Sequence, residues 1–218
     1  MAIRLSGRLD TEALAAAVGD VVERHESLRT RFPMYSGVPT QVVVPTTEVV
    51  PSLRPIPVPE GELEYRLSAI AGAGFDVTVA APVRAELLHT GDDDHVLCIV
   101  VHHICADGFS MAPLARDVMT AYAARTAGTA PEWSPLPVQY IDYTLWQQRS
   151  LGAQDDPDSV LAAQLRYWTR ALDGLPELVS LPTDHPRPNT ASMKGAVHDF
   201  RIDEETHRMV DEWLAWVD

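Results

Sequence analysis

Hydrophobic residues alternate with polar ones at the start of the chain and then change to a helical spacing. Residues 3–9 place an apolar or small residue at every second position, which is typical of a strand with one buried face. Asp10 is a candidate helix cap, and apolar residues three or four positions apart follow it as far as about Glu26. The pattern predicts a strand and then a helix, with a further short strand at 42–44.

Prolines interrupt the pattern in the next part of the chain. Pro51, Pro55, Pro57 and Pro59 lie close together, which predicts a surface connection rather than a strand or a helix. Apolar residues at helical spacing follow between 63 and 70. We therefore expect a loop and then a second helix.

Residues 83–102 have the pattern of a β-hairpin. The apolar segments 83–89 and 96–102 are separated by residues 90–94, where a glycine and three aspartates favour a turn. Residues 96–101 are apolar on both faces, as expected for a strand that is covered on each side. The second strand of the hairpin is therefore predicted to be central in its sheet.

Helical spacing returns in the second half of the chain. Ser110 is a candidate cap for a long helix, and Asp158 is a candidate cap for another. A shorter helix is predicted between them at 140–148. The order of strands and helices indicates an α+β domain.

The last part of the chain begins with a proline-rich segment at 181–188. This segment contains too many prolines for a helix or a central strand, so we expect an ordered crossing. A strand near 197–202 and a helix from Glu204 onward are predicted to follow it.

The composition excludes several classes of protein. The chain has 218 residues, of which 46% are hydrophobic, so it can bury a core as a single domain. It has no apolar run long enough to cross a bilayer and no secretory signal, so we expect a cytoplasmic protein without a membrane partner. A net charge of −14 opposes binding to phosphate backbones, so no nucleic-acid partner is expected. Cys98 and Cys105 lack a paired spacing and should be reduced packing residues.

The residues most suited to catalysis or binding lie where the predicted central strand ends. His102 and His103 close that strand, and Asp107 and Gly108 follow in a turn before the next helix. Because side chains alternate along a strand, we expect His102 on the packed side and His103 in a cavity as acid, base or donor. Asp107 could orient an imidazole or pair with an arginine, and Gly108 should adopt a backbone conformation closed to other residues.

Two other interpretations of these residues stay open. Both histidines could be core residues with satisfied hydrogen bonds, which is the ordinary explanation of an isolated pair. The His-x-x-x-Asp spacing could also supply two metal ligands. A third ligand is not evident in the sequence, so we expect no metal site.

Four segments resemble motifs of one family, in the order expected for it. His102–Gly108 resembles the HHxxxDG motif of nonribosomal peptide synthetase condensation domains and of the wider family similar to chloramphenicol acetyltransferase. Arg24–Phe32 resembles their RHExLRTxF motif, and Tyr140–Arg149 resembles YxDYxxWQ. Leu181–Pro188 resembles an LPTDxPRP-like segment.

This resemblance implies a fold and domain boundaries. The fold would be a two-layer α/β sandwich, a chloramphenicol acetyltransferase-like lobe with a mixed, largely antiparallel sheet packed by helices. Residues 1–180 would form the N-terminal lobe without its first motif, and residues 181–218 the crossover segment and the start of the C-terminal lobe. The family's pairing of arginine with the HHxxxDG aspartate implies an Arg24–Asp107 pair, with Arg29 as the alternative partner.

The resemblance also implies a reaction and its partners. An acceptor aminoacyl amine would attack a donor acyl or peptidyl thioester, both carried on phosphopantetheine arms of donor and acceptor peptidyl carrier proteins. His103 would be a general base or a positioning group, supported by His102, Asp107 and Gly108, and no directly bound cofactor is implied. An adjacent adenylation domain and the missing C-terminal lobe are the other expected partners, and without that lobe the chain should be inactive.

Two alternative functions are compatible with the same histidine. A stand-alone acyltransferase would use it on a coenzyme A thioester, whereas a noncatalytic module would only dock carrier proteins. The motifs at 24–32 and 140–149 favour the synthetase over the stand-alone acyltransferase, whereas the noncatalytic module stays open because a lobe without its partner lacks half of the cleft.

Overall fold

The structure is a computed structural model that describes residues 1–179, 182–186, 188–190, 195 and 198–217. It divides into two compact units, Met1–Arg170 and Ala171–Asp218, each of which is described by itself. The predicted division of the family domain after residue 180 stays a prediction.

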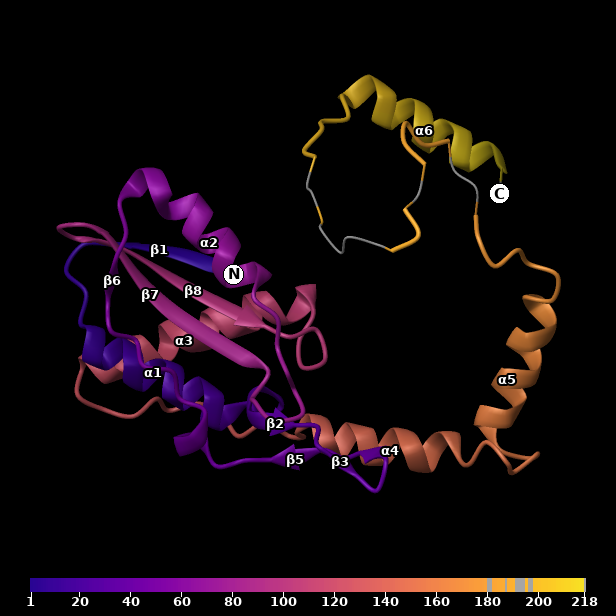
Figure 1. The fold of residues 1–218 in the computed structure, drawn as a ribbon, viewed down its shortest axis with the longest axis horizontal. Coiled ribbons are helices and arrows are strands. Elements are labelled where there is room, and N and C mark those ends of the chain that lie inside the picture. Colours follow the sequence, from indigo (N-terminus) through magenta and orange to yellow (C-terminus); the bar gives the residue numbers. More distant parts are fainter. Residues whose placement is uncertain (180–181, 187, 191–194, 196–197, 218) are drawn as a thin grey trace. The chain divides into compact units, whose positions relative to one another are not determined.

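The first unit contains one main sheet, two small strand pairs and most of the helices (Figure 1). Its strands are β1 (Ala2–Ser6), β2 (Thr30–Arg31), β3 (Met34–Tyr35), β4 (Val38–Pro39), β5 (Val42–Val43), β6 (Ile56–Pro57), β7 (Val83–Gly91) and β8 (Asp94–Val101). Its helices are α1 (Thr11–Arg24), α2 (Leu63–Gly72), α3 (Met111–Thr126), α4 (Tyr140–Leu151) and α5 (Val160–Ala171), of which only the last residue belongs to the second unit. Short 3₁₀ turns include η1 (Glu26–Arg29) and η4 (Gly108–Ser110).

The main sheet has the strand order β1–β8–β7–β6. β8 pairs antiparallel with both β1 and β7, so that Leu97 lies opposite Ile3 on one side and Leu87 on the other. β6 joins the outer edge of β7 in parallel. The predicted hairpin, the central position of its second strand and the mixed, largely antiparallel sheet are confirmed.

Both faces of the central strand are covered by helices. On one face, Leu97 and Ile99 pack in a core with buried residues of α1 and α3, whereas on the other face Val96 and Cys98 pack with residues of α2. Leu97 on one face and Cys98 on the other are only 1% and 4% exposed, which explains why β8 is apolar on both sides. The predicted α+β class is confirmed, and α2 provides cover on the second face.

Helix α1 begins where the sequence predicted it. The Asp10 carboxylate accepts hydrogen bonds from the amides of Glu12 (3.1 Å) and Ala13 (2.9 Å), which satisfies two amides that have no partner within the helix. Leu14, Val18 and Val21 then bury one face of the helix against the sheet. The cap and the apolar spacing together fix the start of the helix and its buried face.

The proline-rich segment 51–59 is more than the surface connection that was predicted. It contains β6, in which Ile56 pairs with Leu88, and Leu53 and Val58 on either side are only 4% and 8% exposed. Pro57 has no amide hydrogen to donate, which an edge strand tolerates. The prediction was wrong because the edge of β7, far away in sequence, provides the pairing partner.

Two predicted helix caps are displaced by one to three residues. Asp107, not Ser110, caps the 3₁₀ turn η4 that leads into α3, because the Ser110 side chain is bonded back to Asp107. Ser159, not Asp158, caps α5 by accepting a hydrogen bond from the amide of Ala162 at 3.0 Å. The helices themselves are confirmed.

The second unit contains α6 (Glu204–Val217), so the predicted final helix is confirmed. Its first turn is capped by Asp203, whose carboxylate accepts a hydrogen bond from the amide of Thr206 at 2.8 Å.

Residues 198–202 form no strand, which corrects the strand predicted near 197–202, although residue 197 lies outside the described residues. The described parts of 181–188 contain neither helix nor strand, as expected, whereas residues 181 and 187 lie outside the description. No helix in the described part of the chain is long and apolar enough to cross a membrane.

Candidate functional site

The two adjacent histidines lie in a turn just beyond the end of β8. The His102 amide still donates to the carbonyl of Pro82 at 2.8 Å, but residues 103–105 turn away from the strand. The His102 ring packs edge-on against Phe75 with ring centroids 6.0 Å apart, and its Nδ1 accepts a hydrogen bond from the Ile104 amide at 3.0 Å. His102 is therefore a half-buried, hydrogen-bonded residue, as predicted for the packed side.

His103 is exposed to solvent at this turn. Its exposure leaves the imidazole free to meet a substrate, but the ring does not line the pocket described below. That His103 faces a cavity of the intact domain stays a prediction. The strand ends at Val101, so the alternation rule no longer applies to the next two residues.

Asp107 is bonded within its own loop rather than to an arginine. Its carboxylate accepts hydrogen bonds from the Ser110 hydroxyl (2.7 Å) and the Ser110 amide (3.0 Å), and its own amide donates to the Ser110 hydroxyl oxygen at 3.1 Å. The hydrogen bonds from the Ser110 hydroxyl and amide hold the pKa of the Asp107 carboxyl below its ordinary value. Asp107 thus fixes the start of the helical segment after the histidines.

The predicted Arg24–Asp107 pair is wrong, because Arg24 pairs with Asp117 on α3. Arg24 Nε donates to Asp117 Oδ2 at 3.1 Å, and both side chains are nearly buried. The alternative partner, Arg29, instead donates to the Val44 carbonyl at 2.9 Å and pairs with Glu26 at 3.2 Å. Both arginines therefore stabilise the segment that carries the RHExLRTxF-like motif, away from the Asp107 loop.

Sequence reasoning missed Asp117, although the chain contains a signal for it. The residue lies on the same face of α3 as the buried Leu114, Val118 and Ala121, and is itself only 8% exposed. A carboxylate within a buried helical stripe requires a charged or donating partner. His25 supplies a second partner, with its Nε2 2.8 Å from the same Asp117 oxygen.

Gln139 is a second residue that the sequence analysis missed. Its side-chain amide nitrogen donates to the Arg24 carbonyl at 2.9 Å, while its side-chain oxygen accepts from the Glu26 amide at 3.2 Å. These two bonds flank His25 on the backbone, where α1 ends and η1 begins. Gln139 thereby joins the residues before α4 to the end of α1.

Gly108 does not adopt the unusual backbone conformation that was expected. Its φ lies outside the positive range in which glycine is favoured, and an added Cβ would meet no heavy atom within 4 Å. The expectation was wrong because the capping box of Asp107 forms with ordinary backbone angles. A side chain larger than hydrogen would therefore be tolerated at this position.

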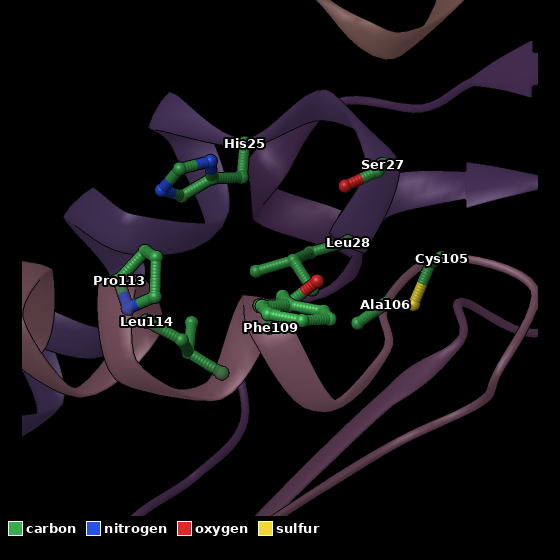
Figure 2. Close-up of a pocket in the computed structure, with 9 residues that line it drawn as sticks. His25, Ser27, Leu28, Cys105, Ala106, Phe109, Pro113 and Leu114 are labelled. Atoms are coloured by element: carbon green, nitrogen blue, oxygen red, sulfur yellow. The ribbon is translucent and has the colours of Figure 1, made fainter. Parts of the chain in front are cut away.

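A pocket of about 340 Å³ lies between two segments of the chain (Figure 2). We call residues 25–28 the His25 segment and residues 105–110 the Asp107 loop. One wall comes from the end of α1 and from η1, and the other comes from the loop, η4 and the start of α3. The lining residues on these walls include His25, Ser27, Leu28, Ala106, Phe109 and Leu114.

Cys105 also lines this pocket, but as an inert wall residue. Burial raises the pKa of its thiol to about 11, and the thiol lies 3.1 Å from the His102 carbonyl oxygen. A thiol with this pKa stays protonated near neutral pH and is a poor nucleophile. Within the described ranges, no three His, Cys, Asp or Glu side chains are grouped so that they could hold a metal ion.

Comparison with known proteins identifies the family. The model of the condensation domain family matches residues 1–215. The chain belongs to the condensation domain family. The recognition made from the four motifs is therefore confirmed.

The curated relatives of this condensation domain include synthetases of nonribosomal peptides. It is 53% identical over 95% of its length to a probable non-canonical nonribosomal peptide synthetase from Salinispora arenicola, and 47% identical over 97% to a dimodular nonribosomal peptide synthase from Bacillus subtilis. It is also 51% identical over 90% of its length to an isonitrile lipopeptide synthase from Mycobacterium tuberculosis. The matched regions make up only 3%, 9% and 8% of these three proteins, respectively.

Solved structures resemble this condensation domain over most of its length. The X-domain from teicoplanin biosynthesis matches with a TM-score of 0.79 and 42% identity, over 86% of this chain and 41% of that one. The SgcC5 protein from Streptomyces globisporus matches with a TM-score of 0.63 and 32% identity, over 85% of this chain and 42% of that one. The chain therefore spans about two fifths of each solved relative.

Proposed function

We propose that this condensation domain helps to form an amide bond between two substrates held on peptidyl carrier proteins. The acceptor's aminoacyl amine attacks the carbonyl carbon of the donor acyl or peptidyl thioester, the carbon–sulfur bond breaks, and the donor arm leaves as a thiol. The amine loses one proton in this exchange and the departing sulfur gains one. No directly bound cofactor is needed for this step.

His103 is the residue that we assign to the chemistry. The supporting observation is its place in the HHxxxDG segment of a family member, as an exposed imidazole at the end of the central strand. An imidazole titrates near neutral pH, so it can accept the amine proton or donate a hydrogen bond that orients the amine. His102 and Asp107 support this position by fixing the turn and the following helix, and Gly108 is the first residue of the 3₁₀ turn that Asp107 caps.

The test is condensation by the intact domain that contains residues 1–218, with both carrier proteins loaded. We expect His103→Ala to abolish product while the circular dichroism spectrum and carrier-protein binding stay unchanged. Ile104→Ala is the matched control, because it shortens the next exposed side chain of the same turn and keeps the imidazole. Near-normal product from His103→Ala would remove His103 from the mechanism. Turnover of a coenzyme A thioester in place of the donor carrier would instead support a stand-alone acyltransferase.

We also propose that residues 1–218 alone form no amide bond. The solved relatives are more than twice as long as the part that this chain matches. Holding two reactants in a productive arrangement can lower a barrier by about 7–11 kcal/mol, and we expect a second lobe to provide much of that positioning. Product formation by the 218-residue chain alone would contradict this proposal, whereas activity restored by adding the C-terminal lobe would support it.

A further inference from the structure

We propose that the pocket between the His25 segment and the Asp107 loop receives the apolar side chain of one of the two thioester-bound substrates. This inference rests on the proposed condensation function, because it makes the pocket a specificity element of the same site. The donor and the acceptor both offer a side chain of this chemistry, and the experiment below distinguishes them.

The first argument is the short distance from the pocket to the proposed catalytic histidine. Cys105 and Ala106 line the pocket and follow His103 by two and three residues. Two residues of extended chain span about 7 Å at most, so the Cα atoms of His103 and Cys105 lie within that distance. The side chain of an aminoacyl group is only a few bonds from its reacting atoms, so a substrate at His103 can reach this pocket.

The second argument is the chemistry of the walls. Leu28, Phe109, Pro113 and Leu114 contribute hydrocarbon, and the Cys105 thiol is protonated. A volume of about 340 Å³ lies at the lower end of the range of about 300–1,000 Å³ that is usual for small-molecule sites. The pocket thus suits an apolar group of the size of an amino-acid side chain better than a charged one.

The third argument is that two polar side chains of the walls, those of His25 and Ser110, are already held by the protein. The His25 ring is bonded to Asp117, and the Ser110 hydroxyl is bonded to Asp107. The pocket is therefore preformed, and little side-chain freedom has to be lost when a ligand enters. Phe109, which lines one edge of the pocket, is 93% exposed and can therefore be reached from solvent.

Ser27 provides the means to test the assignment. Its side chain points into the space between the two walls (Figure 2), and its hydroxyl makes no hydrogen bond among the described residues. Ser27→Phe should fill the pocket without breaking a polar contact, and Ser27→Ala is the matched control that leaves it open. Ala106→Leu fills the same pocket from the opposite wall and serves if Ser27→Phe fails to fold.

The measurement is binding of pantetheine amides by calorimetry to the intact domain that contains residues 1–218, so that the pocket is tested together with the lobe that we expect to position the substrates. Leucyl-pantetheine amide, with its free amine, represents the acceptor, and N-acetyl-leucyl-pantetheine amide represents the donor. Glycyl and N-acetyl-glycyl amides are the references without a side chain. One pair should show a leucine-over-glycine preference of about tenfold or more, and the pair that shows it identifies the source.

The two variants that fill the pocket, Ser27→Phe and Ala106→Leu, should lose the preference for leucine, whereas Ser27→Ala should keep it. All three variants should bind the glycyl amides equally. A preference that survives in both filled variants, or that is absent from the native chain, would overturn the pocket assignment. Neither result bears on whether His103→Ala abolishes condensation, so a failure of the pocket and a failure of the proposed function can be told apart.

Discussion

The two motif segments of this site are held in opposite ways. In the loop after β8, the side-chain bonds of His102 and Asp107 reach residues only two or three positions away. At the end of α1, Arg24 and His25 bond to residues about 90 to 110 positions away, on α3 and in the segment before α4. The first segment is a local, exposed turn that can present a reactive group, whereas the second ties distant parts of the unit together.

This difference suggests that the two motif segments have different roles in the fold. A residue that bonds only to its neighbours can be changed without loosening the rest of the fold. A residue that neutralises a buried charge on another helix cannot. Substitutions in the two segments should therefore differ more in their effect on the free energy of unfolding than in their effect on activity, because damage to either segment would reduce activity.

The largest loss of stability is expected from breaking the Arg24–Asp117 pair. Asp117 is 8% exposed, so Arg24→Ala leaves a buried carboxylate whose remaining partners are His25 at 2.8 Å and the exposed Arg116 at 3.7 Å. Removal of one member of a buried pair costs about 3–5 kcal/mol. Urea unfolding should show a loss of this size for Arg24→Ala, and Asp117→Asn should also be strongly destabilising.

The double variant tests whether the two residues interact. Arg24→Ala with Asp117→Asn should cost less than the sum of the single changes, because the second change removes the charge that the first exposes. Arg24→Ala with Asp107→Ala should be additive, since Asp107 is bonded to Ser110 instead. If the two changes in the free energy of unfolding were not additive, the result would support the Arg24–Asp107 pair that the sequence predicted and the structure does not show.

The same contrast explains what the sequence could predict. The hairpin, the central strand β8 and the Asp10 cap follow from spacing and from residues only a few positions apart. The motif order led to the correct family. Strand β6 and the partner of Arg24 were not predictable in the same way, because each depends on a residue brought close only by folding. Asp117 could have been flagged as a carboxylate on a buried helix face, but its partner could not have been named.

A smaller, pH-dependent effect is expected in the Asp107 loop. The folded pKa of Asp107 lies below its ordinary value of 3.8, so its contribution to stability is complete above that value. The contribution is lost as the pH falls from there through the lower folded pKa, when the carboxylate becomes protonated. Asp107→Ala should therefore lower the melting temperature at neutral pH, by less than Arg24→Ala, and the difference from the native protein should shrink in acid.

Ser110→Ala provides the matched variant for this loop. It removes the hydroxyl that donates to Asp107 and accepts from the Asp107 amide, but keeps the amide that also donates to the carboxylate. Its pH-dependent loss should have the same direction as that of Asp107→Ala and a smaller size. A difference that stays constant with pH would show that the Asp107 charge does not stabilise the loop.

The smallest effect on stability is expected from His103→Ala. His103 is exposed in a turn, and substitutions at such sites usually change the free energy of unfolding by no more than about 0.5 kcal/mol. His102→Ala is the internal contrast, because it removes the packing against Phe75 and the acceptor for the Ile104 amide. We expect this neighbour to cost about 0.5–1.5 kcal/mol in the same urea titration. If both variants were equally stable, the assignment of His102 to support and of His103 to chemistry would lose its structural basis. If His103→Ala were the less stable, the two assignments would be exchanged.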